Sequence, residues 1–215
     1  MTPRIMAALA LILGGGVWLA FLGRMNEGPF VSPEGRHLRN MKERKDAPAS
    51  FTPFTFDSFA ALPHTTSLAR FLPLERRGVS LVAYARWMNT WSDGDFHIDL
   101  APIQMGLGDQ GPMPVTAEIT EWWRRGSKRW TYERLAAEFR PHDWYAPDWP
   151  RPPRLVRLSG WLMYDFEYDA PYLPSRQPIV SGPSGSRRLT GWEIHPVTRI
   201  ELWDDSLHRF VEYPR

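Results

Sequence analysis

The chain has 215 residues, a length that fits one folded domain with accessory segments, and 43% of them are apolar, enough for a hydrophobic core. Its 21 prolines and 16 glycines argue against an all-helical protein. The net charge of +2, with acidic and basic residues interleaved, gives no strong electrostatic attraction for nucleic acid, and the absence of cysteine excludes disulfides, zinc–thiolate sites and thiol catalysis.

The first 23 residues are expected to form a membrane anchor or a signal segment. Residues 5–22 carry no charge and are long enough for a short transmembrane helix, and no convincing cleavage site follows them. We therefore favour an uncleaved single-pass anchor that enters the lipid bilayer through residues 5–22. A cleaved signal is the alternative, which the three glycines at 14–16 keep open. Positive charges flank the run on both sides, and counting them alone would place the following domain in the cytoplasm. A single N-terminal anchor on a small domain more often exports it, so we expect the domain to lie outside the cytoplasm.

Residues 24–76 are expected to be a proline-rich tether. Residues 36–46 form a dense charge run, which indicates a solvated spacer. Four phenylalanines then recur at short spacing and could pack on the domain as an extended strap: Phe51, Phe54, Phe56 and Phe59.

From residue 77 to 204 the pattern becomes regular. Five segments are rich in strand formers or alternate apolar and polar residues, and we predict strands at 79–89, 96–103, 115–120, 154–165 and 189–203. Between the third and fourth, residues 128–140 follow helical spacing, with Ser127 as the expected N-cap. Gly160, inside the fourth strand, predicts a bulge or a bend. Residues 205–215 are expected to be a C-terminal tail.

This order predicts a mainly β protein. Three strands, one helix and two strands are the order of an OB-like, five-stranded Greek-key barrel with its helix between strands 3 and 4. The connection 166–188 would then join strands 4 and 5, where a loop commonly lines the OB binding face.

Residues 78–203 contain four motifs: D-x-H-I-x-L at 95–100, V-x-A-E-I-T at 115–120, V-R-L-S-G-W-L-x-Y-D at 156–165 and W-E-I-H-P-V-T-x-I-E at 192–201. In this combination the segment resembles an uncharacterised bacterial family of OB-fold-like domains. The resemblance implies the fold and a set of recurring polar positions, without an established activity. Where relatives continue the third of these motifs with an acidic residue and a histidine, this chain has Phe166-Glu167-Tyr168.

Alternation places one polar set on the outer side of three neighbouring strands, with the apolar residues between them facing inward. These catalytic candidates are His97, Asp99, Glu118, Glu193 and His195. They suit acid–base chemistry, or a divalent metal held by His97, Asp99, Glu193 and His195. No spacing matches a known metal signature, so no cofactor is predicted and a divalent metal stays an open alternative. Ordinary cross-strand pairing with arginines such as Arg86, Arg157 and Arg199 explains the set equally well.

Aromatic and basic residues supply a second group of candidates, which could bind a ligand by stacking and charge. They are Tyr84, Trp87, Trp91, Trp122, Trp123, Arg124 and Arg125. Core packing in a small barrel explains the eleven tryptophans of the chain equally well. We expect a membrane-anchored binding module whose ligand is a nucleic acid, a glycan or a protein. The alternative is a metal-dependent phosphodiester hydrolase that uses the His/Asp/Glu set, so enzymatic activity is left open.

Overall fold

The computed structural model describes residues 32–65, 67–90, 94–104, 112–127, 130–139, 152–168, 180–181 and 186–214. The chain divides into two compact units, residues 1–39 and residues 40–215. Of the first unit, the described part is the beginning of helix α2 (Pro33–Lys42), where the Ser32 hydroxyl accepts a hydrogen bond from the Gly35 N–H at 3.0 Å. The expected anchor at 5–22 lies outside the described residues. Within the described ranges, no helix has the length and apolar composition needed to cross a bilayer.

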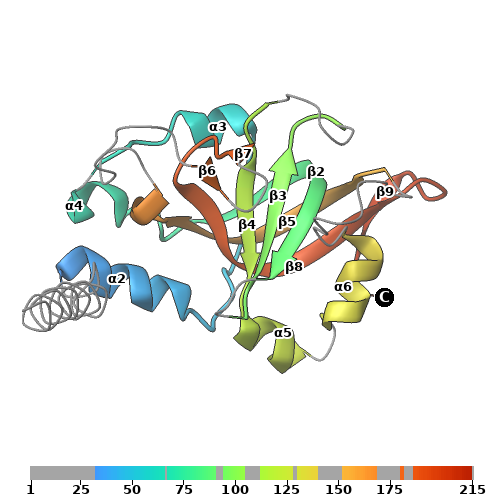
Figure 1. Cartoon of the computed structure of the whole chain (residues 1–215), viewed down its shortest axis with the longest axis horizontal. Helices are drawn as coiled ribbons and strands as arrows, with labels where there is room; N and C mark the ends of the chain where they lie inside the picture. The colour runs from blue at the N-terminus through green and yellow to red at the C-terminus, as the bar shows by residue number, and fades with distance from the viewer. Residues whose placement is uncertain are drawn as a thin grey trace, which may run out of the picture. The chain divides into compact units, whose positions relative to one another are not determined.

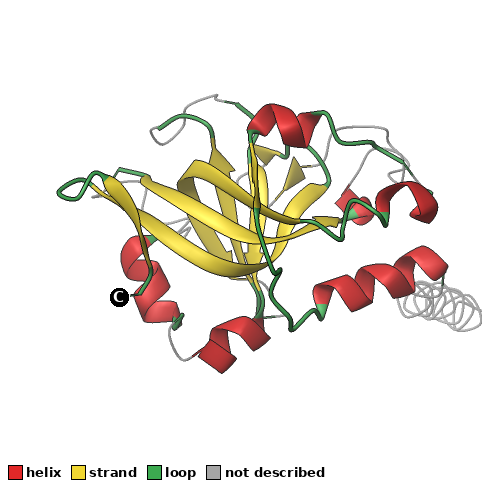
Figure 2. Cartoon of the chain, turned by 180° about the vertical axis from the view of Figure 1, so that it is seen from behind, coloured by secondary structure: helices red, strands yellow, loops and turns green. Residues whose placement is uncertain are grey.

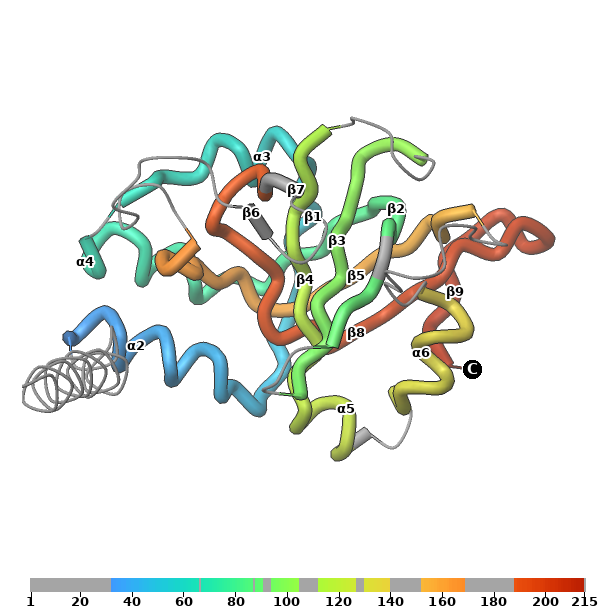
Figure 3. Tube along the Cα trace, viewed as in Figure 1, coloured from blue at the N-terminus to red at the C-terminus, as the bar shows by residue number. Residues whose placement is uncertain are grey.

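The second unit is built on a closed five-stranded barrel (Figure 1). Its strands are β2 (Gly78–Thr90), β3 (Phe96–Ala101), β4 (Val115–Ile119), β5 (Arg154–Tyr164) and β8 (Trp192–Asp204). They pair in the order β2-β3-β4-β8-β5, and β5 pairs again with β2. Only the β4–β8 contact is parallel among these pairs, and it brings two segments far apart in the sequence side by side (Figure 3). The prediction of a mainly β, five-stranded barrel is confirmed.

Alternation along the strands builds the core. Leu81, Leu158 and Ile200 come from three adjacent strands and are at most 1% exposed, so they face the barrel interior. Gly160 marks the predicted irregularity of β5, since the register with β8 shifts on both sides of it. A Cβ at this position would lie 2.1 Å from the Pro196 carbonyl oxygen, so only glycine allows the two strands to approach this closely.

A helical segment lies between the third and fourth barrel strands, as predicted, but with different bounds. Two short helices form, α5 (Glu121–Ser127) and α6 (Tyr132–Glu138). The Thr131 hydroxyl accepts the Arg134 N–H at 3.4 Å and caps α6, so the expected N-cap Ser127 instead ends α5. The ligand-binding candidates Trp122–Arg125 lie on α5, beyond the end of the third barrel strand. Figure 2 shows strands at the centre of this unit and short helices outside them.

Regular elements also flank the barrel in the segments expected to be tether and tail. Strand β1 (Thr52–Phe54) pairs in parallel with β2, and helices α3 (Phe56–Ala60) and α4 (Leu68–Phe71) follow it. Phe59 is fully buried, with its ring 5.4 Å from that of Phe54. Near the C-terminus, β9 (Arg209–Glu212) pairs with β8. A short 3-10 helix, η2 (Phe166–Tyr168), and the two-residue strands β6 (Val180–Ser181) and β7 (Ser186–Arg187) complete the described elements.

Candidate functional site

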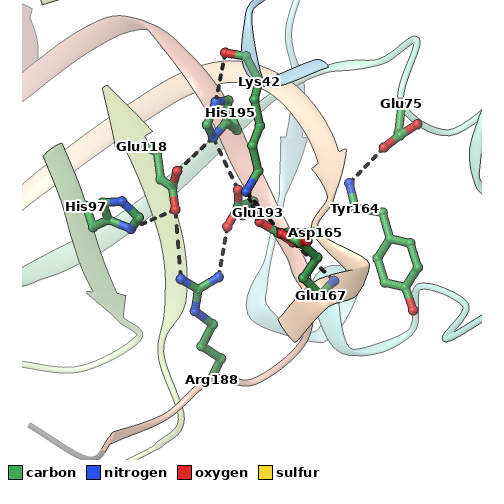
Figure 4. Close-up of polar contacts among 10 residues, drawn as sticks. All are labelled: Lys42, Glu75, His97, Glu118, Tyr164, Asp165, Glu167, Arg188, Glu193 and His195. Carbon is green, nitrogen blue, oxygen red and sulfur yellow. Dashed lines mark hydrogen bonds and ion pairs between the residues drawn. The ribbon is translucent and has the colours of Figure 1, made fainter. Parts of the chain in front are cut away.

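The structure brings four of the five catalytic candidates into one cluster. His97 and Glu118 are directly paired across β3 and β4. The parallel pairing of Ala117 with Ile194 sets the neighbouring outward positions Glu193 and His195 of β8 beside Glu118 (Figure 4). These side chains leave the barrel on its outer side, as alternation predicts, because the apolar residues between them fill the interior.

These outer side chains are nevertheless buried. Glu193 and His195 have no exposed surface, and Glu118 is 3% exposed. Other parts of the second unit lie against them, including the Lys42 carbonyl oxygen, which is 3.3 Å from His195 Nε2. Asp99, the fifth candidate, is 7% exposed and faces Thr116 in the register of β3 and β4.

Glu118 is the hub of the cluster. Its Oε1 lies 2.7 Å from His97 Nδ1, and its Oε2 lies 2.9 Å from His195 Nδ1. His195 Nδ1 is also 3.2 Å from Glu193 Oε1. Arg188 closes the group from the segment before β8, with Nη1 3.0 Å from Glu193 Oε2 and Nη2 3.8 Å from Glu118 Oε1.

Sequence reasoning missed three members of this network. Lys42 Nζ lies 2.7 Å from Asp165 Oδ2 and 3.9 Å from Glu167 Oε2, and the Asp165 side chain is 1% exposed. Lys42 belongs to the charge run that was expected to be a solvated spacer, and Arg188 belongs to the connection before the last strand. Asp165 had a signal, since it is the final residue of the V-R-L-S-G-W-L-x-Y-D motif.

The charges of the cluster stabilise one another. Burial alone would lower the pKa of His195, but hydrogen bonds and charges from Glu118 and Glu193 outweigh it and raise the pKa to about 10. Burial would likewise lower the pKa of His97, but the charge of Glu118 and its hydrogen bond outweigh this effect and raise the pKa above its ordinary value. Desolvation would raise the pKa of Glu118, yet the charge of His97 and the hydrogen bonds from both histidines hold it well below its usual range. The His195 imidazole is therefore cationic at neutral pH.

A group with metal-ligating atoms overlaps this cluster but differs from the predicted set. Asp95, Glu118 and His195 each place one such atom within 4.8 Å of the others. The fit to a cation is poor, because His195 Nδ1 faces carboxylates and its Nε2 faces the Lys42 carbonyl. An imidazolium with acceptors at both nitrogens has no lone pair for a metal. Asp95 Oδ1 already accepts the Glu121 N–H at 2.7 Å, at the start of α5.

The aromatic and basic candidates are mostly engaged in packing. Trp123 Nε1 donates to the Arg44 carbonyl oxygen at 3.3 Å, and Arg124 donates to the Gly94 carbonyl oxygen at 2.9 Å. Arg125 pairs with Glu121 one turn earlier at 2.5 Å, while Trp122 remains 46% exposed. Tyr84 lies on β2, a different element from these helix residues, and the Trp87 side chain and Trp91 lie outside the described part of the chain.

An open cavity of about 610 Å³ lies elsewhere on the barrel, where the β1 segment meets the outer faces of β2, β5 and β8. One part of its lining is apolar and comes mainly from Phe51, Pro53, Phe54, Phe56, Val82 and Pro102. The other part is polar and comes from Ser80, Arg157, Ser159, Arg199 and Glu201, with Thr55 at the start of α3.

Strand register explains the polar part of this cavity. Val82 pairs with Arg157, and Arg157 pairs with Glu201, which forms one row across β2, β5 and β8. Ser80, Ser159 and Arg199 form the next row in the same outward phase. Sequence reasoning treated the two arginines only as partners for carboxylates and did not join them to the phenylalanines, because that contact depends on the parallel pairing of β1 with β2.

Comparison with protein-family models, with curated proteins and with solved structures finds no match to this chain. The geometry of the cluster and of the cavity therefore carries the functional argument.

Proposed function

We propose that the barrel is an OB-like binding module without catalytic activity and that its ligand, or the inserted part of a larger ligand, occupies the cavity of about 610 Å³. This volume falls in the range of ligand sites, roughly 300–1,000 Å³. A mainly apolar wall with a few polar groups is also the usual composition of such sites. The cavity is the observation that carries the proposal.

The classification as an OB-like Greek-key barrel rests on strand order. The third and fifth barrel strands are neighbours, the fourth lies beyond the fifth, and the first strand closes against the fourth. OB barrels commonly bind ligands on the face of strands 2 and 3. Here that face carries the buried charge cluster, in contact with Lys42 and Arg188, so we place the ligand on the face of β2, β5 and β8 instead.

The charge cluster then has a mechanical role in this proposal. Lys42 belongs to the chain before the barrel, Asp165 directly follows the end of β5, and Arg188 belongs to the segment before β8. Their ion pairs with the barrel fix these segments in place, because breaking one leaves a charge without a partner in a buried site. We further propose that residues 5–22 tether this module to a bilayer, with the barrel outside the cytoplasm, as their uncharged apolar run favours. Protease accessibility in sealed vesicles tests that orientation.

A substitution that fills the cavity tests the binding function. Val82 lines the cavity and is 46% exposed, so Val82→Trp should obstruct the site without disturbing the core. Val82→Thr is the control of matched size. Three probes are titrated into the full chain: a labelled single-stranded oligonucleotide, a labelled oligosaccharide and the small apolar dye N-phenyl-1-naphthylamine. Saturable binding that Val82→Trp abolishes and Val82→Thr retains supports the module; binding by no probe, or binding that Val82→Trp leaves unchanged, contradicts it.

A metal-dependent phosphodiester hydrolase is the second candidate, favoured by the proximity of Asp95, Glu118 and His195. Such an enzyme needs an open coordination position and an accessible water, whereas His195 is fully buried between acceptors. To bind His195 at Nδ1, manganese or zinc would therefore have to displace the proton on that nitrogen, which faces the carboxylates of Glu118 and Glu193. Shortening of the oligonucleotide on a denaturing gel, dependent on added metal and lost in His195→Ala, would reverse the preference for a binding module.

A further inference from the structure

We propose that the cavity selects a small amphipathic ligand with a single negative charge, whose anionic group lies against Arg157 and Arg199 and whose apolar body lies against the phenylalanines. The inference rests on the proposed binding function and narrows it to a class of ligand. Two features of the lining support it. The first is the positive sign of its exposed charge, and the second is the set of N–H donors that the arginines do not use in their ion pairs.

The accessible charge of the cavity is positive. Its lining contains two arginines and one carboxylate, and the Glu201 side chain is only 7% exposed. The Arg157 and Arg199 side chains are 37% and 44% exposed, so a ligand meets the guanidinium groups before the carboxylate beneath them. Glu212 contacts Arg199 Nε at 3.7 Å, but it is not part of the lining. The residues that line the cavity therefore carry one more positive than negative charge, and the exposed part of that charge is positive, which favours an anionic group on the ligand.

The guanidinium groups of Arg157 and Arg199 use only some of their N–H donors in the contacts with Glu201. Arg157 uses Nη1 alone to reach both Glu201 oxygens, at 3.3 and 3.4 Å, and Arg199 reaches Oε1 of Glu201 through Nη2 at 3.3 Å. A guanidinium carries five N–H donors, so several remain for a carboxylate, sulfonate or phosphate oxygen. Arg157 also lies over the Phe210 ring at 4.2 Å, which helps to fix its guanidinium before any ligand arrives.

The apolar part of the lining sets the other half of the ligand. Phe51, Phe54 and Phe56 are partly exposed, although phenylalanine is usually buried, and all three line the cavity. An aromatic or aliphatic body placed against them would remove apolar surface from water, which favours binding. An inorganic anion would leave this wall uncovered, and a neutral apolar molecule would offer no acceptor to the remaining N–H donors of the two arginines.

Two dyes with the same ring system separate the contribution of the negative charge from that of the apolar body. 1-Anilinonaphthalene-8-sulfonate carries one negative charge, and N-phenyl-1-naphthylamine is its neutral counterpart. Both are titrated into the full chain, and binding that survives in Val82→Trp is subtracted as binding elsewhere. Arg199→Met should weaken the anionic dye by roughly tenfold, the effect of one charge-assisted hydrogen bond, and change the neutral dye by less than about twofold. Arg199→Lys, which keeps the charge, should retain most of the affinity for the anion.

The outcomes distinguish the two proposals. Equal effects of Arg199→Met on both dyes, or no effect on either, would overturn anion selection while leaving the cavity as a binding site. Arg157→Met repeats the test should Arg199→Met fail to fold. Signals from both dyes that Val82→Trp does not alter would instead overturn the binding function itself.

Discussion

Raising the pH above neutrality should destabilise this protein, because folding holds His195 in its charged form. Burial would lower the pKa of this imidazole, but Glu118 and Glu193 raise it from the ordinary value of 6.5 to about 10. In the unfolded chain the same group titrates near 6.5. A group with a raised folded-state pKa contributes its stabilisation fully below the unfolded value and loses it as the pH rises through the folded value. The window for His195 therefore runs from pH 6.5 to about 10.

The two pKa values give an upper magnitude of about 5 kcal/mol for this contribution, lost at about 1.4 kcal/mol per pH unit across the window. That is a large part of the roughly 5–15 kcal/mol that stabilises a typical domain. His97 acts in the same direction, since its pKa is also raised. Lys42 stays charged throughout, because Asp165 and other carboxylates outweigh its desolvation and raise its pKa above 10.5.

Urea unfolding followed by tryptophan fluorescence measures this contribution at several pH values between 6.5 and 9.5. The native protein should lose free energy of unfolding steadily across the series. His195→Gln, which cannot titrate, should start lower at pH 6.5 and decline much less. A native stability that stays level or rises over this range would refute the reasoning, as would equal slopes for the native protein and the variant.

Three further substitutions test the packing around the barrel by the same unfolding measurement. Glu118→Gln should lower the free energy of unfolding by about 3–5 kcal/mol, because it leaves buried cations without their carboxylate. The control Glu212→Gln, at an exposed position, should change it by less than about 0.5 kcal/mol. Similar losses for both variants would contradict the central role of Glu118. Gly160→Ala should cost at least about 2 kcal/mol, since its Cβ would meet backbone, whereas Gly126→Ala, with no atom within 4 Å, should be neutral or gain up to about 1 kcal/mol. Lys42→Met should cost roughly 2–4 kcal/mol, and an unchanged midpoint would show that the ion pair with the chain before the barrel carries no weight.

The barrel was predictable because each of its strands has a recognisable local sequence pattern. Val115–Ile119 and the other strands combine β-branched residues with an alternation that matches the side-chain period of a strand, and the pairing of His97 with Glu118 follows from that phase. The helix bounds were less predictable. Ser127 and Thr131 both suit an N-cap, and only the hydrogen bond from the Arg134 N–H to Thr131 shows which one begins a helix.

The burial of the cluster could not be read from the sequence. Glu, Lys and Arg are usually exposed, so a charge run that contains Lys42 indicates a solvated spacer. Its ion pair with Asp165 joins residues that are far apart along the chain and follow no shared period. The cavity could not be predicted for the same reason. Three phenylalanines and two arginines line it together only because β1 pairs with β2.

The most direct test of the binding proposal is a crystal structure of the protein grown with N-phenyl-1-naphthylamine. The proposal predicts density for the dye against Phe54 and Val82, in the cavity between the β1 segment and the outer face of β2, β5 and β8. A cavity closed by the protein's own side chains, or dye density at other places only, would contradict it.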